Sequence, residues 1–189
     1  VFDITPDIII SAKGLTSGYV PLAAMIISDR LIDEVSQSVE GGAVFSNGFT
    51  YSGHPVACAA ALANMDVFES DGLLENARTL GPYMQSQLQS LADLPIVGDI
   101  RGRGLMGCLE CVASKESKQP LDLDYAVGSR IDKYCQQLGL LVRPLINMCV
   151  MSPPLCITTE QIDDMVKILR EGISRTMDDL EREGVGRFS

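Results

Sequence analysis

Lys13 is the first residue of this sequence whose surroundings suit a reactive amine. It lies three residues after the apolar run Ile8–Ile10 and directly before Gly14. The end of a buried strand is where α/β proteins place residues that contact ligands. A lysine desolvated there can act as a nucleophile and form a Schiff base with a carbonyl compound. The local pattern by itself favours a solvated lysine at a strand end, so other motifs have to support the reactive interpretation.

Thr50 stands in a second segment with chemical potential, Asn47–Pro55, which reads NGFTYSGHP. Small hydroxyl residues and glycines just before a helix suit phosphate, because hydroxyls and free backbone N–H groups can converge on the anion. A capped turn with Ser52 near the N-cap is the simpler explanation of the same composition. His54 has no acidic residue nearby in the sequence and is interpreted as structural.

Arg143 is the third candidate. It follows the apolar segment 139–142, which reads as a strand, and precedes Pro144. An arginine at the end of such a strand can hold a carboxylate through two parallel hydrogen bonds. A structural ion pair is an equally good explanation.

Two other patterns match the residue spacing of known site motifs but lack the secondary structure that those motifs require. Cys108 and Cys111 have the two-residue gap of a metal or redox pair, but in a strand such positions point to opposite faces. No second pair follows and His54 is the single histidine, so no metal site is expected. The segment Gly102–Gly107 matches GxGxxG, a fingerprint that requires a helix to begin inside it. The residues that follow look like a strand, so a tight turn between strands explains these glycines better.

The elements that must position these residues alternate between strands and helices. The helix that begins at Pro55 is rich in alanine, which predicts close packing and burial. The polar loop 40–53 before it is long enough to suggest a functional role. Strands are expected at 7–11, 21–28, 96–101, 105–112, 140–143 and 149–152, and helices from 30, 55, 73, 125 and 159 onward.

Composition restricts the kind of protein. The 189 residues are 46% hydrophobic and 21% charged, which is typical of a globular chain. A net charge of -10 without a Lys/Arg cluster argues against nucleic-acid or anionic-membrane partners. The apolar runs are too short to span a bilayer. The first residues have neither an initiator Met nor the features of a signal peptide, so we expect a fragment or a trimmed product from a reducing compartment, the cytoplasm.

Three segments together resemble one family. They are TPDIIISAKGLTSGYVPL at 5–22, GFTYSGHP at 48–55, and GLLVRP at 139–144 followed by SPPL at 152–155. Their order and spacing resemble those of the class III pyridoxal-phosphate aminotransferases. This family includes the omega-transaminases of the amine–pyruvate and β-alanine–pyruvate type. The resemblance covers essentially the whole chain.

The resemblance implies an α/β fold, namely the C-terminal part of a fold-type I pyridoxal-phosphate transferase. Residues 1–70 would end the large domain with its mostly parallel sheet, and residues 71–189 would form the small α+β C-terminal domain. The implied reaction is transamination between an amine or amino acid and pyruvate or a similar keto acid, with pyridoxal 5'-phosphate as cofactor.

The resemblance also implies roles for individual residues. Lys13 would form the Schiff base with the cofactor and then carry the proton between cofactor and substrate. Thr50, with the backbone of Phe49, would bind the cofactor phosphate of the neighbouring subunit, so a homodimer or higher oligomer is expected. Arg143 would pair with the substrate carboxylate and swing out when an uncharged side chain enters.

The family's remaining site residues precede the lysine: an aspartate for the pyridine nitrogen, an aromatic over the ring and a Gly-Ser phosphate turn. None is found in these 189 residues, because Asp3 and Asp7 lie too close to Lys13. The chain is therefore expected to be the C-terminal portion of such an enzyme and to be inactive alone. Two alternatives stay open: another reaction on the same fold (aminomutase, decarboxylase or racemase), or a non-catalytic remnant that acts as an interaction module.

Overall fold

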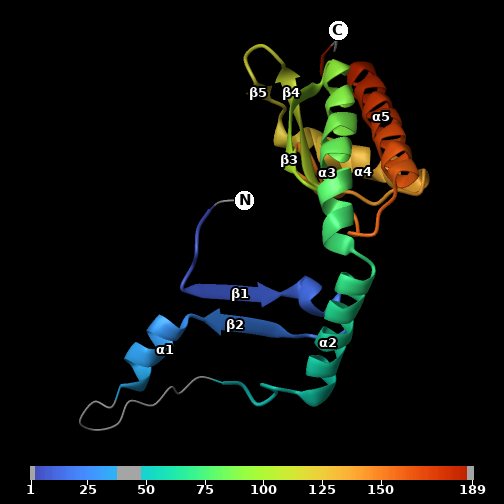
Figure 1. The fold of residues 1–189 in the computed structure, drawn as a ribbon. Helices are drawn as coiled ribbons and strands as arrows, with labels where there is room; N and C mark the ends of the chain where they lie inside the picture. Colours follow the sequence, from blue (N-terminus) through green and yellow to red (C-terminus); the bar gives the residue numbers. More distant parts are fainter. Residues whose placement is uncertain (1–2, 38–47, 187–189) are drawn as a thin grey trace. The chain divides into compact units, whose positions relative to one another are not determined.

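The computed structural model describes residues 3–37 and 48–186 of the chain (Figure 1). The chain divides into two compact units, Val1–Asp71 and Gly72–Ser189, which are described separately. No helix in the described ranges is long and apolar enough to cross a membrane.

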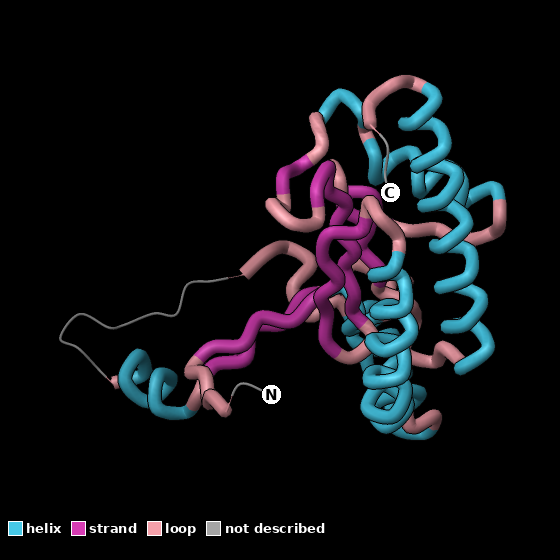
Figure 2. Tube along the Cα trace, turned by 90° about the horizontal axis from the view of Figure 1, so that it is seen from above, coloured by secondary structure: helices cyan, strands magenta, loops and turns pink. Residues whose placement is uncertain are grey.

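The first unit is a two-stranded sheet with two helices. Strand β1 (Ile8–Ala12) pairs antiparallel with β2 (Ala23–Ile27), as Figure 2 shows, and a short 3-10 helix, η1 (Lys13–Thr16), begins the connection between them. Helix α1 (Asp29–Ser36) follows β2, and α2 (Pro55–Ser70) begins with a proline in its first turn, as expected. Of the loop expected at 40–53, residues 40–47 lie outside the described residues.

Two burial predictions for this unit are wrong. Ile8, Ile9 and Ile10 are 48%, 46% and 76% exposed, whereas a buried strand was expected. In α2 only Ala57 and Ala61 are buried, and the other apolar side chains of the helix are exposed or half-buried. Two strands make too small a sheet to cover a face, and the parallel neighbours expected for β1 are not among the described residues. The apolar sequence was read correctly as a strand, but burial depends on what packs against it.

The second unit is an antiparallel sheet covered on one face by helices. The strand order is β3-β4-β7-β6, with the short β5 paired to β4. Figure 1 shows the three helices together on one side of this sheet. The strands are β3 (Val97–Arg103), β4 (Met106–Ser114), β5 (Gln119–Pro120), β6 (Arg143–Leu145) and β7 (Met148–Met151), the helices are α3 (Leu73–Gln89), α4 (Val127–Gln137) and α5 (Thr159–Arg182), and the 3-10 helices are η2 (Ser90–Asp93) and η3 (Leu123–Tyr125).

The core of this unit lies between the sheet and the helices. Leu109 and Cys149 lie opposite one another on β4 and β7 and are fully buried against Leu88, Ile131 and Leu169 of the three helices. The opposite face of the sheet carries charged side chains. Alternation along each strand therefore separates an apolar face from a polar face, as expected for an antiparallel sheet with one side open.

The glycines of the GxGxxG segment serve a hairpin. Gly104 stands at the turn between β3 and β4 with φ +56°. A methyl group added at Gly107 would come within 2.6 Å of Leu88 Cδ1, and one at Gly102 within 2.6 Å of Gln85 Oε1. Both glycines thus allow α3 to pack directly on the hairpin. The interpretation of this segment as a turn between strands is confirmed.

The strand expected at 140–143 begins later than expected. Gly139 ends α4 with φ +93°, and the next residues fold back on that helix: Leu140 N–H donates to Cys135 O at 2.9 Å. Val142 N–H donates to Asp132 Oδ1 at 3.4 Å. Of the residues 140–143, only Arg143 belongs to the sheet. It is the first residue of β6, not the last residue of a strand.

Candidate active site

Lys13 stands at the junction of β1 and η1, in an unusual backbone conformation. Its φ is +55°, in the left-handed region that residues with a Cβ rarely adopt, and the preceding Ala12 is extended. The chain therefore turns sharply at the lysine, at the end of a strand as expected. The side chain is exposed.

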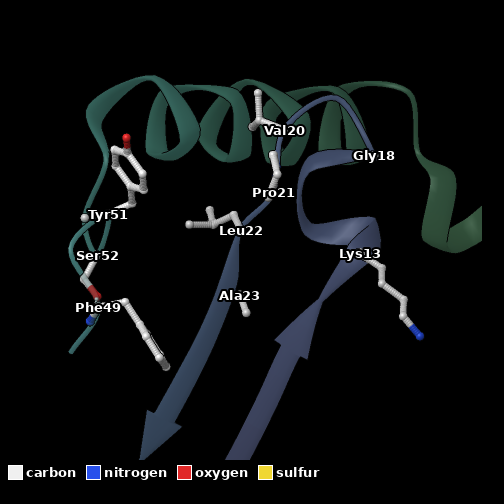
Figure 3. A pocket seen from close by; sticks show the side chains of 10 residues that line it. Lys13, Gly18, Val20, Pro21, Leu22, Ala23, Phe49, Tyr51 and Ser52 are labelled. Carbon is white, nitrogen blue, oxygen red and sulfur yellow. Dashed lines mark hydrogen bonds between the residues drawn. The ribbon is translucent and has the colours of Figure 1, made fainter. Parts of the chain in front are cut away.

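A cavity of about 780 Å³ brings Lys13 together with the turn before α2. Phe49 and Tyr51 contribute from that turn, and Pro21 and Leu22 from the approach to β2 (Figure 3). The lysine side chain points away from the rings of Phe49 and Tyr51 in Figure 3. The cavity is lined by Lys13, Gly18, Val20, Pro21, Leu22, Ala23, Phe49, Tyr51, Ser52 and Gly53.

The turn before α2 is held by its own hydrogen bonds. Phe49 N–H donates to Ser52 Oγ at 2.8 Å, and Ser52 N–H donates to Phe49 O at 2.9 Å. Ser52 therefore caps this turn, while the N-cap position of α2 is His54. The ring of His54 lies edge-on to that of Tyr51, with 5.9 Å between centroids. Thr50 is exposed and lies outside the set of residues that line the cavity.

Arg143 belongs to the second unit, and the structure argues against the structural ion pair that was one explanation for this residue. It lies opposite Val150, and Val150 lies opposite Cys108, on the open face of the sheet. Arg101, at the far end of this row, binds Asp99 and Glu110 at 2.7 Å each, and these carboxylates raise the pKa of its guanidinium. Arg143 has no ion-pair partner within the described residues. The structural ion pair that could have accounted for Arg143 is therefore not formed there.

The paired cysteines are separated as expected for a strand. Cys108 is half-buried on the open face, whereas Cys111 is buried in the core, where burial raises the pKa of its thiol to about 12. Their side chains point to opposite faces of β4 and do not form a pair.

The family model of the class III aminotransferases matches residues 1–173. The chain belongs to this family. The resemblance seen in the sequence is thereby confirmed.

Individual class III aminotransferases match nearly the whole chain. An uncharacterized aminotransferase of Sinorhizobium fredii is 40% identical over 97% of this chain, and the putrescine–pyruvate aminotransferase of Pseudomonas aeruginosa is 37% identical over 90%. An aminotransferase structure from Vibrio fluvialis in a PMP-bound form matches 94% of the chain with a TM-score of 0.89 and 40% identity. These relatives are longer: the chain spans 40%, 37% and 39% of them, respectively.

The structural match also confirms the expected fold class, a mixed α/β chain that corresponds to the C-terminal part of a fold-type I aminotransferase. Of the four residues that sequence reasoning selected, Lys13 and Phe49 line the cavity, Thr50 follows Phe49 in the chain without lining it, and Arg143 lies in the other unit. The sequence did not single out Asn64, which binds the turn after Lys13 from α2. A polar residue within the alanine-rich stripe of that helix was the available signal.

Proposed function

We propose that this chain supplies part of the active site of a pyridoxal-phosphate enzyme that transfers an amino group from an amine or amino acid to pyruvate or a similar keto acid. Membership of the class III aminotransferases supports the reaction type. A putrescine–pyruvate relative supports the choice of pyruvate. Because the chain spans about two fifths of its relatives, turnover belongs to a longer protein, and the 189 residues alone are inactive.

The residues around Lys13 fit the cofactor. The cavity is within the size range of small-molecule sites, and it is lined by Lys13 and by a turn that carries hydroxyl groups. When bound, pyridoxal phosphate supplies an electron sink for the charge that develops at the substrate carbon. Lys13 Nζ is the amine that binds the cofactor aldehyde and the base that moves the proton at the substrate α-carbon.

Thr50 and the backbone of Phe49 bind the cofactor phosphate of a neighbouring subunit in this proposal. Phe49 lines the cavity of its own Lys13, and both Phe49 and Thr50 are exposed, which is compatible with contact to a second chain. Phosphate must compete with Ser52 Oγ for the Phe49 N–H. The enzyme is then a homodimer or a higher oligomer in which each site uses two chains.

Arg143 binds the substrate carboxylate through its guanidinium, and the absence of an ion-pair partner within the described residues leaves it available. Residues 1–70 belong to the large cofactor-binding domain and residues 71–189 form the small domain. The division of the contacts between Asp71 and Gly72 supports this assignment. We place the enzyme in the cytoplasm.

The observation that carries the proposal is Lys13 in a ligand-sized cavity of a class III chain. The complete enzyme, incubated with pyridoxal phosphate and then reduced with borohydride, should carry the cofactor on Lys13, as peptide mass spectrometry would show. Lys13→Ala should abolish both the label and the absorbance band of the bound cofactor. A Lys13→Ala protein that still forms the reducible adduct in its active site would contradict the assignment.

A further inference from the structure

The backbone around Lys13 needs external support. Lys13 and Ser17, at the two ends of η1, both have left-handed φ values, +55° and +49°. Such values are costly for residues with a Cβ and persist only where the surrounding structure holds them. A four-residue 3-10 helix has too few internal hydrogen bonds to do this alone.

Asn64 of α2 provides such support. Its Nδ2 donates to Gly14 O at 3.0 Å and to Leu15 O at 3.2 Å. Its Oδ1 accepts a hydrogen bond from Ser17 Oγ at 2.5 Å. One side chain, about fifty residues along the chain, thus binds three of the four residues that follow Lys13.

Thr16, the remaining residue of this turn, is fixed separately. Its side chain is buried, and Oγ1 donates to Val20 O at 2.6 Å. Tyr19 N–H returns a hydrogen bond to Thr16 O at 3.1 Å. The turn is therefore anchored at Thr16 by its own neighbours, and at Gly14, Leu15 and Ser17 by Asn64 of α2.

We propose that Asn64 is a positioning residue, which holds η1 so that the left-handed backbone of Lys13 directs Nζ at the cofactor. The proposal rests on the role of Lys13 in the proposed function. Without the Asn64 amide, the turn relaxes toward ordinary φ values and the lysine stem leaves from a different direction. A displacement of about 1 Å at a reacting atom is enough to slow a reaction strongly.

The chain contains a matched control. Asn76 of α3 is half-buried like Asn64, and its Nδ2 also donates to two backbone carbonyls, Leu155 O at 2.6 Å and Ile157 O at 3.0 Å. It lies in the other unit. Asn76→Asp therefore removes the same kind of double hydrogen bond from a turn that holds no proposed catalytic group.

The experiment measures how fast borohydride fixes pyridoxal phosphate on Lys13 of the complete enzyme, relative to the exposed Lys133 in the same sample. Asn64→Asp should lower this ratio roughly tenfold or more, and Asn76→Asp should leave it within about twofold of the wild type. Ser17→Ala, which removes one of the three bonds, should change it in the same direction by less. The pH midpoint of the cofactor absorbance band should move in the two variants near Lys13 only.

The outcomes separate the two proposals. If the wild type does not label Lys13 faster than Lys133, the role of Lys13 is wrong and the positioning role falls with it. Suppose that the wild type labels Lys13 selectively, and that folded Asn64→Asp and Ser17→Ala show the same ratio of Lys13 to Lys133 labelling. The positioning role is then wrong, and Asn64 contributes only to the packing of α2 on η1. Should thermal unfolding show that Asn64→Asp is not folded, Ser17→Ala decides between these results.

Discussion

Arg143 differs from Arg101 on the same sheet face in making no ion pair within the described residues. Arg101 on the same sheet face binds two carboxylates. An unpaired guanidinium keeps its hydrogen-bond donors for a ligand, so the energy of a charge-assisted contact can be used for substrate binding.

Replacing Arg143 by alanine in the complete enzyme should therefore weaken carboxylate binding. The loss of charge-assisted hydrogen bonds is worth about 1.5–3 kcal/mol, so KM for pyruvate should rise roughly tenfold or more. Activity toward amines without a carboxylate should fall less. Arg103→Ala, an exposed arginine of the same sheet, is the control and should leave both parameters unchanged. Equal losses toward pyruvate and toward amines without a carboxylate would remove Arg143 from substrate binding.

Thr50 should act on the cofactor of the neighbouring subunit. Loss of its hydroxyl should cost about 1.5–3 kcal/mol of cofactor binding, because the acceptor is charged. In a mixed dimer of one Lys13→Ala chain and one Thr50→Ala chain, action in trans places both defects in one site. The other site is then intact and stays active at limiting pyridoxal phosphate.

Action in cis gives a different result in the same measurement. Each site then carries one defect, one without the lysine and the other with weak cofactor binding. Mixed dimers that recover strongly only when excess cofactor is added would show that Thr50 serves its own chain.

At the scale of single elements, the sequence predicted what depends on local chemistry. Pro55 marked the start of α2, and the glycines of the β3–β4 hairpin were interpreted correctly. The helix expected from 159 onward, from its apolar pattern alone, begins at Thr159, and the structure adds a capping box of Thr158 and Gln161. These signals lie within a few residues of the feature that they specify, so one sequence is enough to read them.

Features that depend on distant partners could not be predicted. The exposure of Ile8–Ile10 reflects missing cover, and the late start of β6 reflects the packing of Leu140 on α4. Asn64 stood out as a polar residue in an alanine-rich stripe, but its partner, the turn after Lys13, lies about fifty residues away in the chain and no local pattern identifies it. Among the proposed site residues, the family motifs pointed to Lys13, Phe49, Thr50 and Arg143, but not to Asn64.

The buried thiols of the second unit should make it less stable as the pH rises into the alkaline range. Burial raises the pKa of Cys111 to about 12 and that of Cys135 to about 11, and it also raises that of Cys149. Above pH 9 these thiols ionise in the unfolded chain while staying protonated in the fold. The unfolding free energy should therefore fall by about 1.4 kcal/mol per pH unit for each such thiol.

Urea denaturation between pH 8 and pH 11 would measure this slope. Full stability is expected below pH 9, with a progressive loss as the pH rises toward the folded-state values. Cys111→Val should reduce the slope of unfolding free energy against pH by the contribution of one thiol. Leu109→Val changes a buried side chain without removing a thiol, so it should leave this slope unchanged. A Cys111→Val slope equal to that of the wild type would contradict the ionisation of this group on unfolding.

At the scale of the whole chain, the exposed strands of the first unit predict association. Ile8, Ile9 and Ile10 on β1 and Met25 and Ile26 on β2 place a large apolar surface in water on a sheet with open edges. Sedimentation velocity of the 189-residue chain should show oligomers whose proportion rises with concentration. Activity assays of the same chain should show no transaminase turnover. Combining Ile10→Thr with Ile26→Thr should reduce association, unlike Leu141→Thr at an exposed site of the other unit. A monomer at all concentrations, or measurable turnover, would refute this prediction.

The contribution of α5 to the core has a consequence for the time course of synthesis. Residues Leu109 and Cys149 of the sheet are covered in part by Leu169, Ile173 and Leu180, and the last of these is made 71 residues after Leu109. At ordinary rates of translation this interval is roughly 4–14 s. Throughout it, the apolar face of the nascent sheet lacks the cover that α5 provides. A ribosome that pauses before residue 159 would hold the chain in that state, so we expect chaperones to bind the nascent chain most strongly at that stage.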